Sequence, residues 1–267
     1  MRERAKPQVA KDRHVIGDGT LHGYFTARDG VELAYREVGA GRPLVLIHGF
    51  FSTSRVNWVT YGHAEHLAGL GFRVIMPDLR GHGESGKPHD PAAYPPDVLA
   101  DDGFDLVEHL GLTDYDLGGY SLGGRTTIRM LVRGARPRRA VVAGMGLRGI
   151  EHTGGGNAHF RRVLTGLGTF ERGTPEWRAE AFFRQIGGDR DALLHVLDTS
   201  IDTPRTVLEH LDVPTLVVAG IEDPHHRTAR DLAEVLPHGR YVNVPGNHLS
   251  AVARPELGHA IGEFLTS

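Results

Sequence analysis

The sequence contains no cysteine, and it has no excess of positive charge. Without cysteine the chain can form neither a disulfide nor a thiolate nucleophile, and it cannot bind a metal through sulfur. Its 30 Lys and Arg and 33 Asp and Glu give a formal net charge of −3, which does not favour a nucleic-acid partner. Any catalytic nucleophile must therefore be another residue, such as serine or aspartate.

Long apolar runs are missing as well. No window of the sequence reaches the ~18 consecutive apolar residues that a membrane span requires. Residues 1–12 carry recurrent charges and lack the apolar run of a secretory signal. We therefore expect a cytoplasmic protein without a membrane partner.

The composition that is present is typical of a globular protein, with 40% hydrophobic and 24% charged residues. An α/β fold of ~200–250 residues commonly forms one domain. The length of 267 residues therefore predicts one domain with an insertion. Residues 1–21 are polar and contain glycine, and we interpret them as an N-terminal arm or tail.

Two stretches rich in β-branched and aromatic residues, 24–26 and 31–35, flank the sequence Arg28-Asp29-Gly30. Asp-Gly between such runs is a hairpin signal. We expect an antiparallel hairpin at one edge of a sheet.

Short continuous apolar runs then alternate with segments of helical length. Such runs are typical of strands buried on both faces, and their alternation with helices predicts parallel crossover connections. The expected strands are 44–47, 73–76, 115–120, 140–143, 215–219 and 241–244, and the expected helices are 63–69, 97–110, 122–133, 229–236 and 255–265. The sequence therefore predicts an α/β fold with a mostly parallel, doubly wound sheet, formed by residues 22–143 and 212–267.

Residues 144–211 break this alternation. They contain no β-branched run, but they hold the glycine triplet 154–156 and amphipathic pieces at 160–167, 177–186 and 192–197. We interpret the segment as a helical cap. In open α/β sheets ligands bind beyond the carboxyl ends of the strands, so an insertion at that edge would cover the site.

Residues 119–123 read Gly-Tyr-Ser-Leu-Gly and lie between an expected strand and an expected helix. In that context the pattern predicts a nucleophile elbow, a sharp turn that exposes the serine hydroxyl. Glycine is needed two residues before and after the serine, because both positions approach neighbouring backbone. Unpaired N–H groups and the positive dipole end of the helix favour developing negative charge. Ser121 is therefore the candidate nucleophile.

Two downstream loops offer a base and an acid. A serine hydroxyl is a weak nucleophile, so it needs a base within hydrogen-bond reach and a carboxylate that orients the base. Asp223 and His248 follow the last two expected strands, which places both at the same edge of the sheet as Ser121. We assign His248 as the base and Asp223 as its partner, with Glu222 as the competitor for the acid position.

An oxyanion hole needs two N–H donors directed at the developing charge. We expect one from Leu122, the residue after the nucleophile. The other is expected from Phe50, in the turn that follows the first parallel strand. His48 in the same turn is interpreted as a structural histidine.

Taken together, these motifs resemble those of the α/β-hydrolase family over residues 22–267. Residues 48–50 resemble the family's oxyanion turn, residues 77–85 (PDLRGHGES) its turn after the next strand, residues 119–123 its elbow, and Asp223 and His248 its acid and base. The resemblance implies a capped, cofactor-independent serine hydrolase.

Other polar clusters are interpreted as structural. His63 and His66 lie one turn apart on an expected helix, but no H-E-x-x-H or comparable acidic spacing accompanies them, and we expect no metal. Asp101, Asp102 and Asp105 are expected on an exposed helix face. Asp78, Arg80 and His82 are expected to shape the turn that contains them.

The fold alone does not define the reaction. Epoxide hydrolases and haloalkane dehalogenases of this family use an aspartate nucleophile where this chain has Ser121, and residues 144–211 contain no tyrosine to activate an epoxide. Carbon–carbon bond hydrolases of aromatic degradation use serine, but they resemble His-Gly-x-Gly-Pro-Gly where residues 48–53 read His-Gly-Phe-Phe-Ser-Thr. They remain the alternative enzyme class.

The leading hypothesis is hydrolysis of a small carboxylic ester, with lactones and thioesters as related substrates. The apolar residues expected near the opening favour an uncharged, partly hydrophobic substrate, and the expected substrate contacts are Phe51, Trp58, Tyr120 and Leu249. Peroxide can replace water as the acceptor of an acyl group, so a perhydrolase or haloperoxidase activity is compatible with the same site. The same fold also serves as a slow or non-catalytic ligand receptor, but filled triad positions favour turnover.

Overall fold

The structure, a computed structural model, describes residues 14–15, 17 and 19–267. In this part of the chain nine strands form one sheet in the order β1-β2-β3-β5-β4-β6-β7-β8-β9. The strands are β1 (His14–Val15), β2 (Leu21–Thr26), β3 (Glu32–Val38), β4 (Arg42–Ile47), β5 (Phe72–Pro77), β6 (Asp116–Tyr120), β7 (Ala140–Ala143), β8 (Thr215–Gly220) and β9 (Gly239–Val244). Most of the predicted arm, residues 1–21, lies outside the described residues.

The first strands are antiparallel and the later ones parallel. β2 and β3 form the predicted hairpin, with Phe25 paired to Leu33 across it. β3 joins β5 in the antiparallel sense, and the strands from β5 through β4 to β9 are all parallel. The predicted α/β class with a mostly parallel, doubly wound sheet is confirmed.

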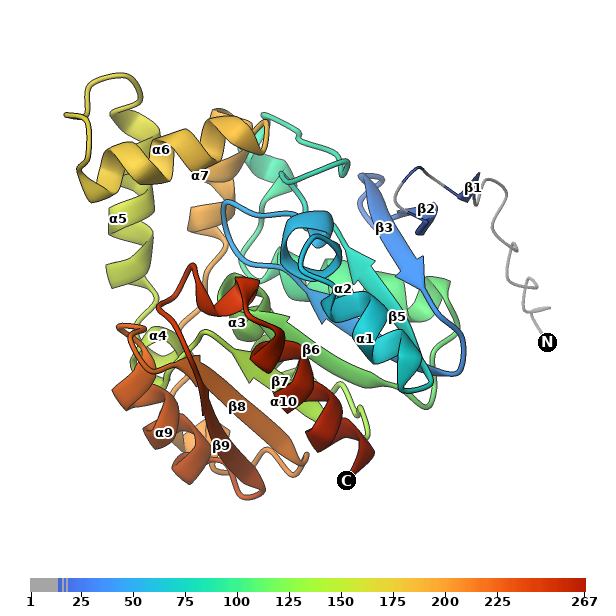
Figure 1. Ribbon diagram of the computed structural model, residues 1–267. Coiled ribbons are helices and arrows are strands. Elements are labelled where there is room, and N and C mark those ends of the chain that lie inside the picture. Colours follow the sequence, from blue (N-terminus) through green and yellow to red (C-terminus); the bar gives the residue numbers. More distant parts are fainter. Residues whose placement is uncertain (1–13, 16, 18) are drawn as a thin grey trace.

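Helices cover both faces of the sheet (Figure 1). They are α1 (His63–Gly69), α2 (Val98–His109), α3 (Leu122–Val132), α9 (His226–Val235) and α10 (Pro255–Thr266), with a short helix η1 (Arg55–Val59) before α1 and η2 (Pro91–Ala93) and η3 (Ala251–Ala253) elsewhere. Alternate residues of β4 belong to different core layers: Leu44 and Leu46 share a layer with residues of α1 and α10, whereas Val45 and Ile47 share one with residues of α2 and α3. This alternation explains why the strands read as continuous apolar runs.

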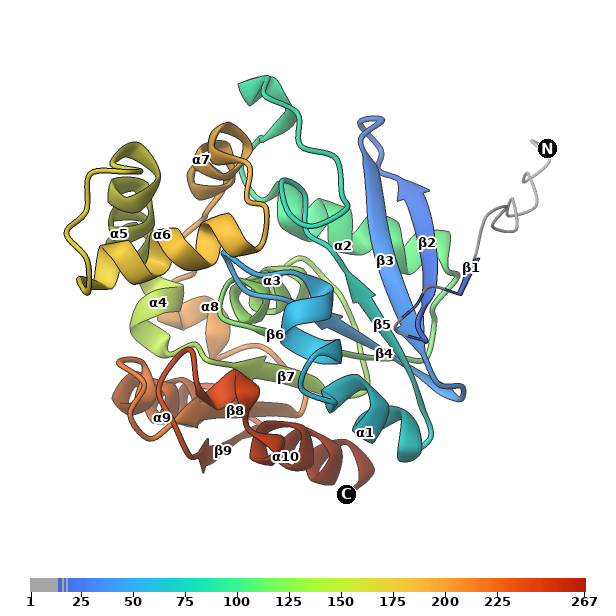
Figure 2. The same ribbon diagram turned by 45° about the horizontal axis from the view of Figure 1, so that its top comes forward.

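Five helices lie between β7 and β8: α4 (Leu147–Glu151), α5 (Gly154–Thr165), α6 (Pro175–Gln185), α7 (Arg190–Asp198) and α8 (Arg205–Leu208). Figures 1 and 2 show α5, α6 and α7 gathered at one end of the sheet. α5 begins on the glycine triplet 154–156, before the amphipathic piece 160–167 that the sequence indicated. The helix forms there because Val163 and Leu164, further along it, are buried in the core. Among the described residues, no helix is long and apolar enough to cross a membrane.

Buried charges hold the turn after β5. Asp78 accepts hydrogen bonds from the N–H groups of Ser54 (2.7 Å) and Glu84 (2.9 Å). Arg80 donates to both carboxylate oxygens of Asp102, at 3.0 and 2.7 Å. The expectation that Asp102 lies on an exposed helix face is wrong, because this carboxylate is buried against Arg80.

Candidate active site

Ser121 lies at the junction of β6 and α3 in an unusual backbone conformation. Its φ is +56° and its ψ is −110°, a region that residues other than glycine rarely adopt. The Ser121 N–H donates to the carbonyl of Ala143 at 2.7 Å, and the Ser121 carbonyl accepts from the N–H of Arg125 at 3.0 Å. The neighbouring strand and the first turn of α3 therefore fix the serine in this conformation.

Two glycines permit the turn. A Cβ on Gly119 would lie 2.3 Å from the backbone of Gly123, and a Cβ on Gly123 would lie 2.1 Å from the carbonyl oxygen of Ile47. Both distances are far inside van der Waals contact. Only a hydrogen atom fits at these positions, so the first turn of α3 packs directly on the end of β4.

Ser121, His248 and Asp223 form one hydrogen-bonded chain. The Oγ of Ser121 lies 3.1 Å from Nε2 of His248, and Nδ1 of His248 lies 2.8 Å from Oδ2 of Asp223. Asp223 follows β8 and His248 follows β9, as the sequence order predicts. Glu222, the competing carboxylate, is exposed to solvent. The structure thus brings together the three side chains assigned as nucleophile, base and acid.

The environment of Asp223 favours a carboxylate. Burial acts to raise its pKa, but the hydrogen bond and positive charge of His248 outweigh burial, with help from the N–H of His225, and the pKa is lowered. That N–H donates to Oδ1 at 2.8 Å, which leaves Oδ2 for the imidazole. An ionised Asp223 can orient His248 with Nε2 free to accept a proton from Ser121.

The turn after β4 lies directly against the elbow. A Cβ on Gly49 would lie 3.3 Å from Cβ of Ser121. The N–H of Gly49 donates to Oδ1 of Asn57 at 2.8 Å, so a buried amide on η1 holds this turn in place. The sequence did not point to Asn57, because no sequence motif links an asparagine to a glycine eight residues before it.

The expected oxyanion donors flank this contact. Leu122 is the first residue of α3, where N–H groups have no acceptor within the helix. In the described part of the chain, neither the N–H of Phe50 nor that of Leu122 donates to another protein atom. His48 is fully buried and shapes the turn: its Nε2 accepts from the N–H of Leu79 at 2.9 Å, and burial lowers its pKa.

Aromatic rings connect the turn after β4 to the inserted helices. Phe50 and Phe51 stack with ring centroids 4.8 Å apart. Phe160 of α5 lies 4.8 Å from Phe50 and 5.0 Å from Phe51, and Phe183 of α6 lies 5.3 Å from Phe51. The insertion therefore contacts the same turn that contacts Ser121.

The four residues expected to contact substrate occupy different environments. Phe51 belongs to this aromatic cluster and has a φ of +50°. Trp58 is fully buried in the core layer of α1 and α10, so it presents no surface to a ligand. Tyr120 is also buried in that layer, and Leu249, beside His248, is 67% exposed.

Tyr120 contacts His248, the candidate base, and is buried. Its hydroxyl donates to the backbone carbonyl of His248 at 2.7 Å. Its ring packs on Gly144, where a Cβ would lie 2.6 Å from the phenol carbon. Tyr120 therefore fixes the position of the loop that carries His248 relative to β7.

His225 lies beside His248, the candidate base, and no sequence motif marked it. Its ring centroid is 5.5 Å from that of His248, and burial lowers its pKa, with a smaller contribution from the charge of His248. Ligand atoms of Asp223, His225 and His248 lie within 4.8 Å of one another, close enough to surround a metal ion. A metal there would displace the proton between Asp223 and His248 and would remove the base, so the geometry fits proton transfer better than metal binding.

Comparisons with known proteins agree with this fold. The family model for the alpha/beta hydrolase fold matches residues 42–149. The non-heme chloroperoxidase CPO-A1 of Kitasatospora aureofaciens is 31% identical over 252 residues, which cover 80% of this chain and 86% of that protein. A non-heme haloperoxidase of Rhodococcus erythropolis is 37% identical over 126 residues, 45% of this chain and 43% of that protein.

Solved structures extend the match over nearly the whole chain. A thermophilic esterase from Thermogutta terrifontis superposes with a TM-score of 0.74 at 28% identity, over 92% of this chain and 98% of that one. The chain belongs to the α/β-hydrolase family. Its relatives include haloperoxidases and esterases.

Proposed function

We propose that the protein is a serine hydrolase that cleaves small, partly hydrophobic carboxylic esters, including lactones and thioesters, through an acyl-enzyme. The observation that supports this most is the continuous hydrogen-bonded chain from Ser121 through His248 to Asp223. Serine is a competent nucleophile only with such a base and an oriented carboxylate, so the three together favour acyl transfer.

The proposed reaction has two halves. Ser121 Oγ attacks the acyl carbon while Nε2 of His248 takes its proton, and the N–H groups of Phe50 and Leu122 hold the oxyanion. His248 then protonates the leaving alcohol. In the second half His248 activates a water molecule that hydrolyses the acyl-enzyme and restores Ser121.

The helices α5–α7 are proposed to act as a cap that selects the acyl group. Phe160 and Phe183 contribute rings to the cluster around Phe50 and Phe51, which supports an apolar wall over the reacting carbon. This arrangement favours substrates with a hydrophobic portion.

A panel of p-nitrophenyl esters with acyl chains of increasing length tests the proposal. Ser121→Ala and His248→Ala should each lower kcat/KM by about three orders of magnitude or more, because members of such a triad act as a unit. Wild-type protein that turns over no ester would contradict the proposal. Cleavage of a vinylogous diketone with inert esters would instead support the carbon–carbon hydrolase.

The similarity to haloperoxidases favours a second activity of the same acyl-enzyme. Hydrogen peroxide in place of water would release a peracid, and the peracid would oxidise halide without a metal. Incubation with acetate, peroxide and bromide tests this, since Ser121-dependent bromination of monochlorodimedone supports it and bromination unchanged in Ser121→Ala argues against it.

A further inference from the structure

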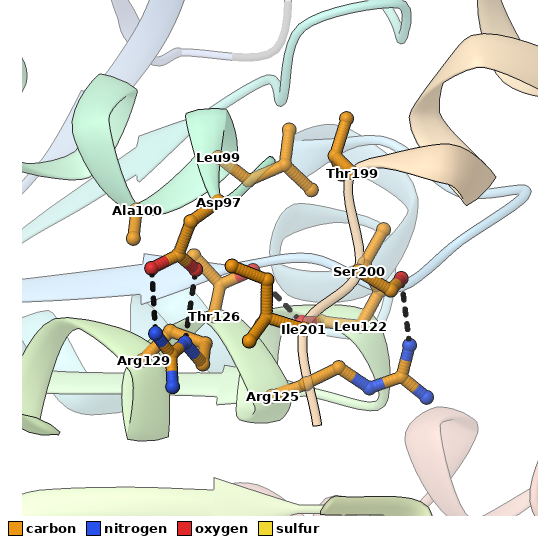
Figure 3. A pocket seen from close by; sticks show the side chains of 10 residues that line it. All are labelled: Asp97, Leu99, Ala100, Leu122, Arg125, Thr126, Arg129, Thr199, Ser200 and Ile201. Carbon is orange, nitrogen blue, oxygen red and sulfur yellow. Dashed lines mark hydrogen bonds and ion pairs between the residues drawn. The ribbon is translucent and has the colours of Figure 1, made fainter. Parts of the chain in front are cut away.

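Arg125 lies one helical turn after Ser121 on α3 and faces the same edge of the sheet. Side chains on a helix lean toward its N-terminus, so the guanidinium of Arg125 is directed back toward the elbow. It lines a pocket together with Leu122 of α3 and with Ser200 and Ile201, which follow α7 (Figure 3). Leu122 directly follows Ser121 at the start of α3, so one wall of this pocket lies beside the elbow.

The guanidinium of Arg125 is poorly satisfied by the protein. It makes one side-chain hydrogen bond, from Nη1 to Oγ of Ser200 at 3.3 Å. Its Nε is fully buried and has no hydrogen-bond partner within the described residues. A guanidinium carries five N–H donors, and a buried cation without partners is costly.

Arg129, one turn further along α3, is an arginine whose donors are paired within the protein. It donates to both carboxylate oxygens of Asp97, at 3.0 and 2.8 Å, and to Thr203 at 3.1 Å. Figure 3 shows the contrast, with two bonds from Arg129 to Asp97 and one from Arg125 to Ser200. Of the two neighbours, Arg125 is the one whose donors remain available.

Asp202 is the acid whose charge raises the pKa of Arg125, but it does not neutralise the guanidinium. Asp202 accepts hydrogen bonds from the N–H and hydroxyl of Thr153, both at 2.8 Å. Among the described residues, the side-chain hydrogen bond of Arg125 goes to Ser200 and not to this carboxylate. Burial lowers the pKa of Arg125 to about 10, and Asp202 offsets only part of this. Arg125 is therefore still a cation at neutral pH.

The charge of Arg125 also acts on His225, which lies beside His248. It contributes to the lowered pKa of His225, after burial and the charge of His248. The ring of His225 lies 5.5 Å from that of His248. An unneutralised positive charge therefore lies close enough to act on His225, the ring that neighbours His248.

We propose that Arg125 binds a carboxylate carried by the substrate, so that the enzyme prefers esters with an anionic group. A carboxylate would accept a bidentate pair of hydrogen bonds from the guanidinium, the geometry for which arginine is suited. The proposal rests on ester hydrolysis at Ser121, and it replaces the uncharged substrate that the sequence favoured with one that carries a carboxylate.

Two matched pairs of esters test it. Mono-p-nitrophenyl glutarate against p-nitrophenyl valerate places the carboxylate on the acyl side, and 4-acetoxybenzoate against phenyl acetate places it on the alcohol side. In wild type at least one anionic ester should have the higher kcat/KM. Arg125→Met should lower that value by about 10- to 100-fold and leave the neutral partner within about threefold.

Two variants separate binding from folding. Arg125→Lys keeps the charge and should retain part of the preference. Arg42→Gln breaks the 2.7 Å ion pair with buried Asp116, outside the pocket, and should lower the melting temperature without changing the preference. An equal loss on anionic and neutral esters in Arg125→Met, or no preference in wild type, would overturn the proposal.

Binding of glutarate to Ser121→Ala, followed by calorimetry, keeps this test independent of catalysis. Arg125→Met in that background should weaken glutarate binding at least about tenfold. If no ester is hydrolysed but glutarate binding depends on Arg125, the proposed function fails and the anion site stands. If glutarate does not bind, or binds equally to both, the anion site fails whatever the ester activity.

Discussion

Ser121 is held in a strained conformation by interactions on both sides of it. A non-glycine residue in a sparsely populated backbone region costs on the order of 1–3 kcal/mol, and such strain persists only where neighbouring structure enforces it. Here the carbonyl of Ala143 and the N–H of Arg125 enforce it. The result is a hydroxyl that points at Nε2 of His248 across 3.1 Å.

Tyr120 provides the residue-scale prediction for positioning of the base. Tyr120→Phe removes the 2.7 Å hydrogen bond to the carbonyl of His248 and leaves this acceptor unpaired. We expect kcat on p-nitrophenyl esters to fall about tenfold with KM nearly unchanged, because His248 is less often within hydrogen-bond distance of Ser121. Steady-state kinetics measures this split.

Tyr115→Phe is the control, since Tyr115 is a buried tyrosine just before β6, at the end of that strand away from Ser121. It should leave kcat unchanged. If Tyr120→Phe changed only the melting temperature, Tyr120 would be a packing residue and no more.

Much of the candidate site could be predicted from the sequence, but only those residues that belong to a recognisable motif. Ser121, Asp223 and His248 were found because each follows a strand at the same sheet edge. Arg125 and Asn57 were not found, because only the folded structure shows that Arg125 has an unpaired donor and that Asn57 contacts Gly49. Trp58 was misplaced near the opening, since an aromatic residue close in sequence to a site can still pack into the opposite layer.

At the scale of elements, glycine positions decide how closely β4, β6 and α3 can approach. Gly119 and Gly123 let the three meet with backbone against backbone. The strands themselves were predictable, because burial on both faces leaves a continuous apolar run. The start of α5 was not, because a glycine triplet has low helix propensity and tertiary packing of later residues overrides it.

Two alanine substitutions contrast these glycines. Gly123→Ala would place Cβ 2.1 Å from the carbonyl oxygen of Ile47, so we expect a loss of about 3 kcal/mol or more in the free energy of unfolding. A Cβ added at Gly155 would have no neighbour within 4 Å, so Gly155→Ala should raise the free energy of unfolding by about 0.5–1 kcal/mol. Urea denaturation measures both. A destabilised Gly155→Ala would show that the first turn of α5 is not helical.

At the scale of the whole molecule, buried histidines couple stability to pH. Burial lowers the pKa of His82 from 6.5 to about 3, and burial lowers that of His48 as well. Between these values the unfolded chain binds a proton that the folded chain does not. Stability is therefore full above about pH 6.5 and is lost as the pH falls toward 3.

We therefore expect the free energy of unfolding to fall on acidification from pH 7 to 5, with about 1.4 kcal/mol per pH unit from each such histidine inside its window. Denaturation at several pH values measures the slope. His82→Gln should reduce it, and His210→Gln, at an exposed position, should not. A slope identical in wild type and His82→Gln would contradict this account.

The central claim is that Ser121 is the nucleophile, and covalent labelling tests it most directly. After incubation with a fluorophosphonate, peptide mass spectrometry of the wild type should find one adduct, on Ser121. Labelling should be abolished in Ser121→Ala and slowed by orders of magnitude in His248→Ala. An unlabelled wild type, or an adduct on another residue that persists in Ser121→Ala, would contradict the account.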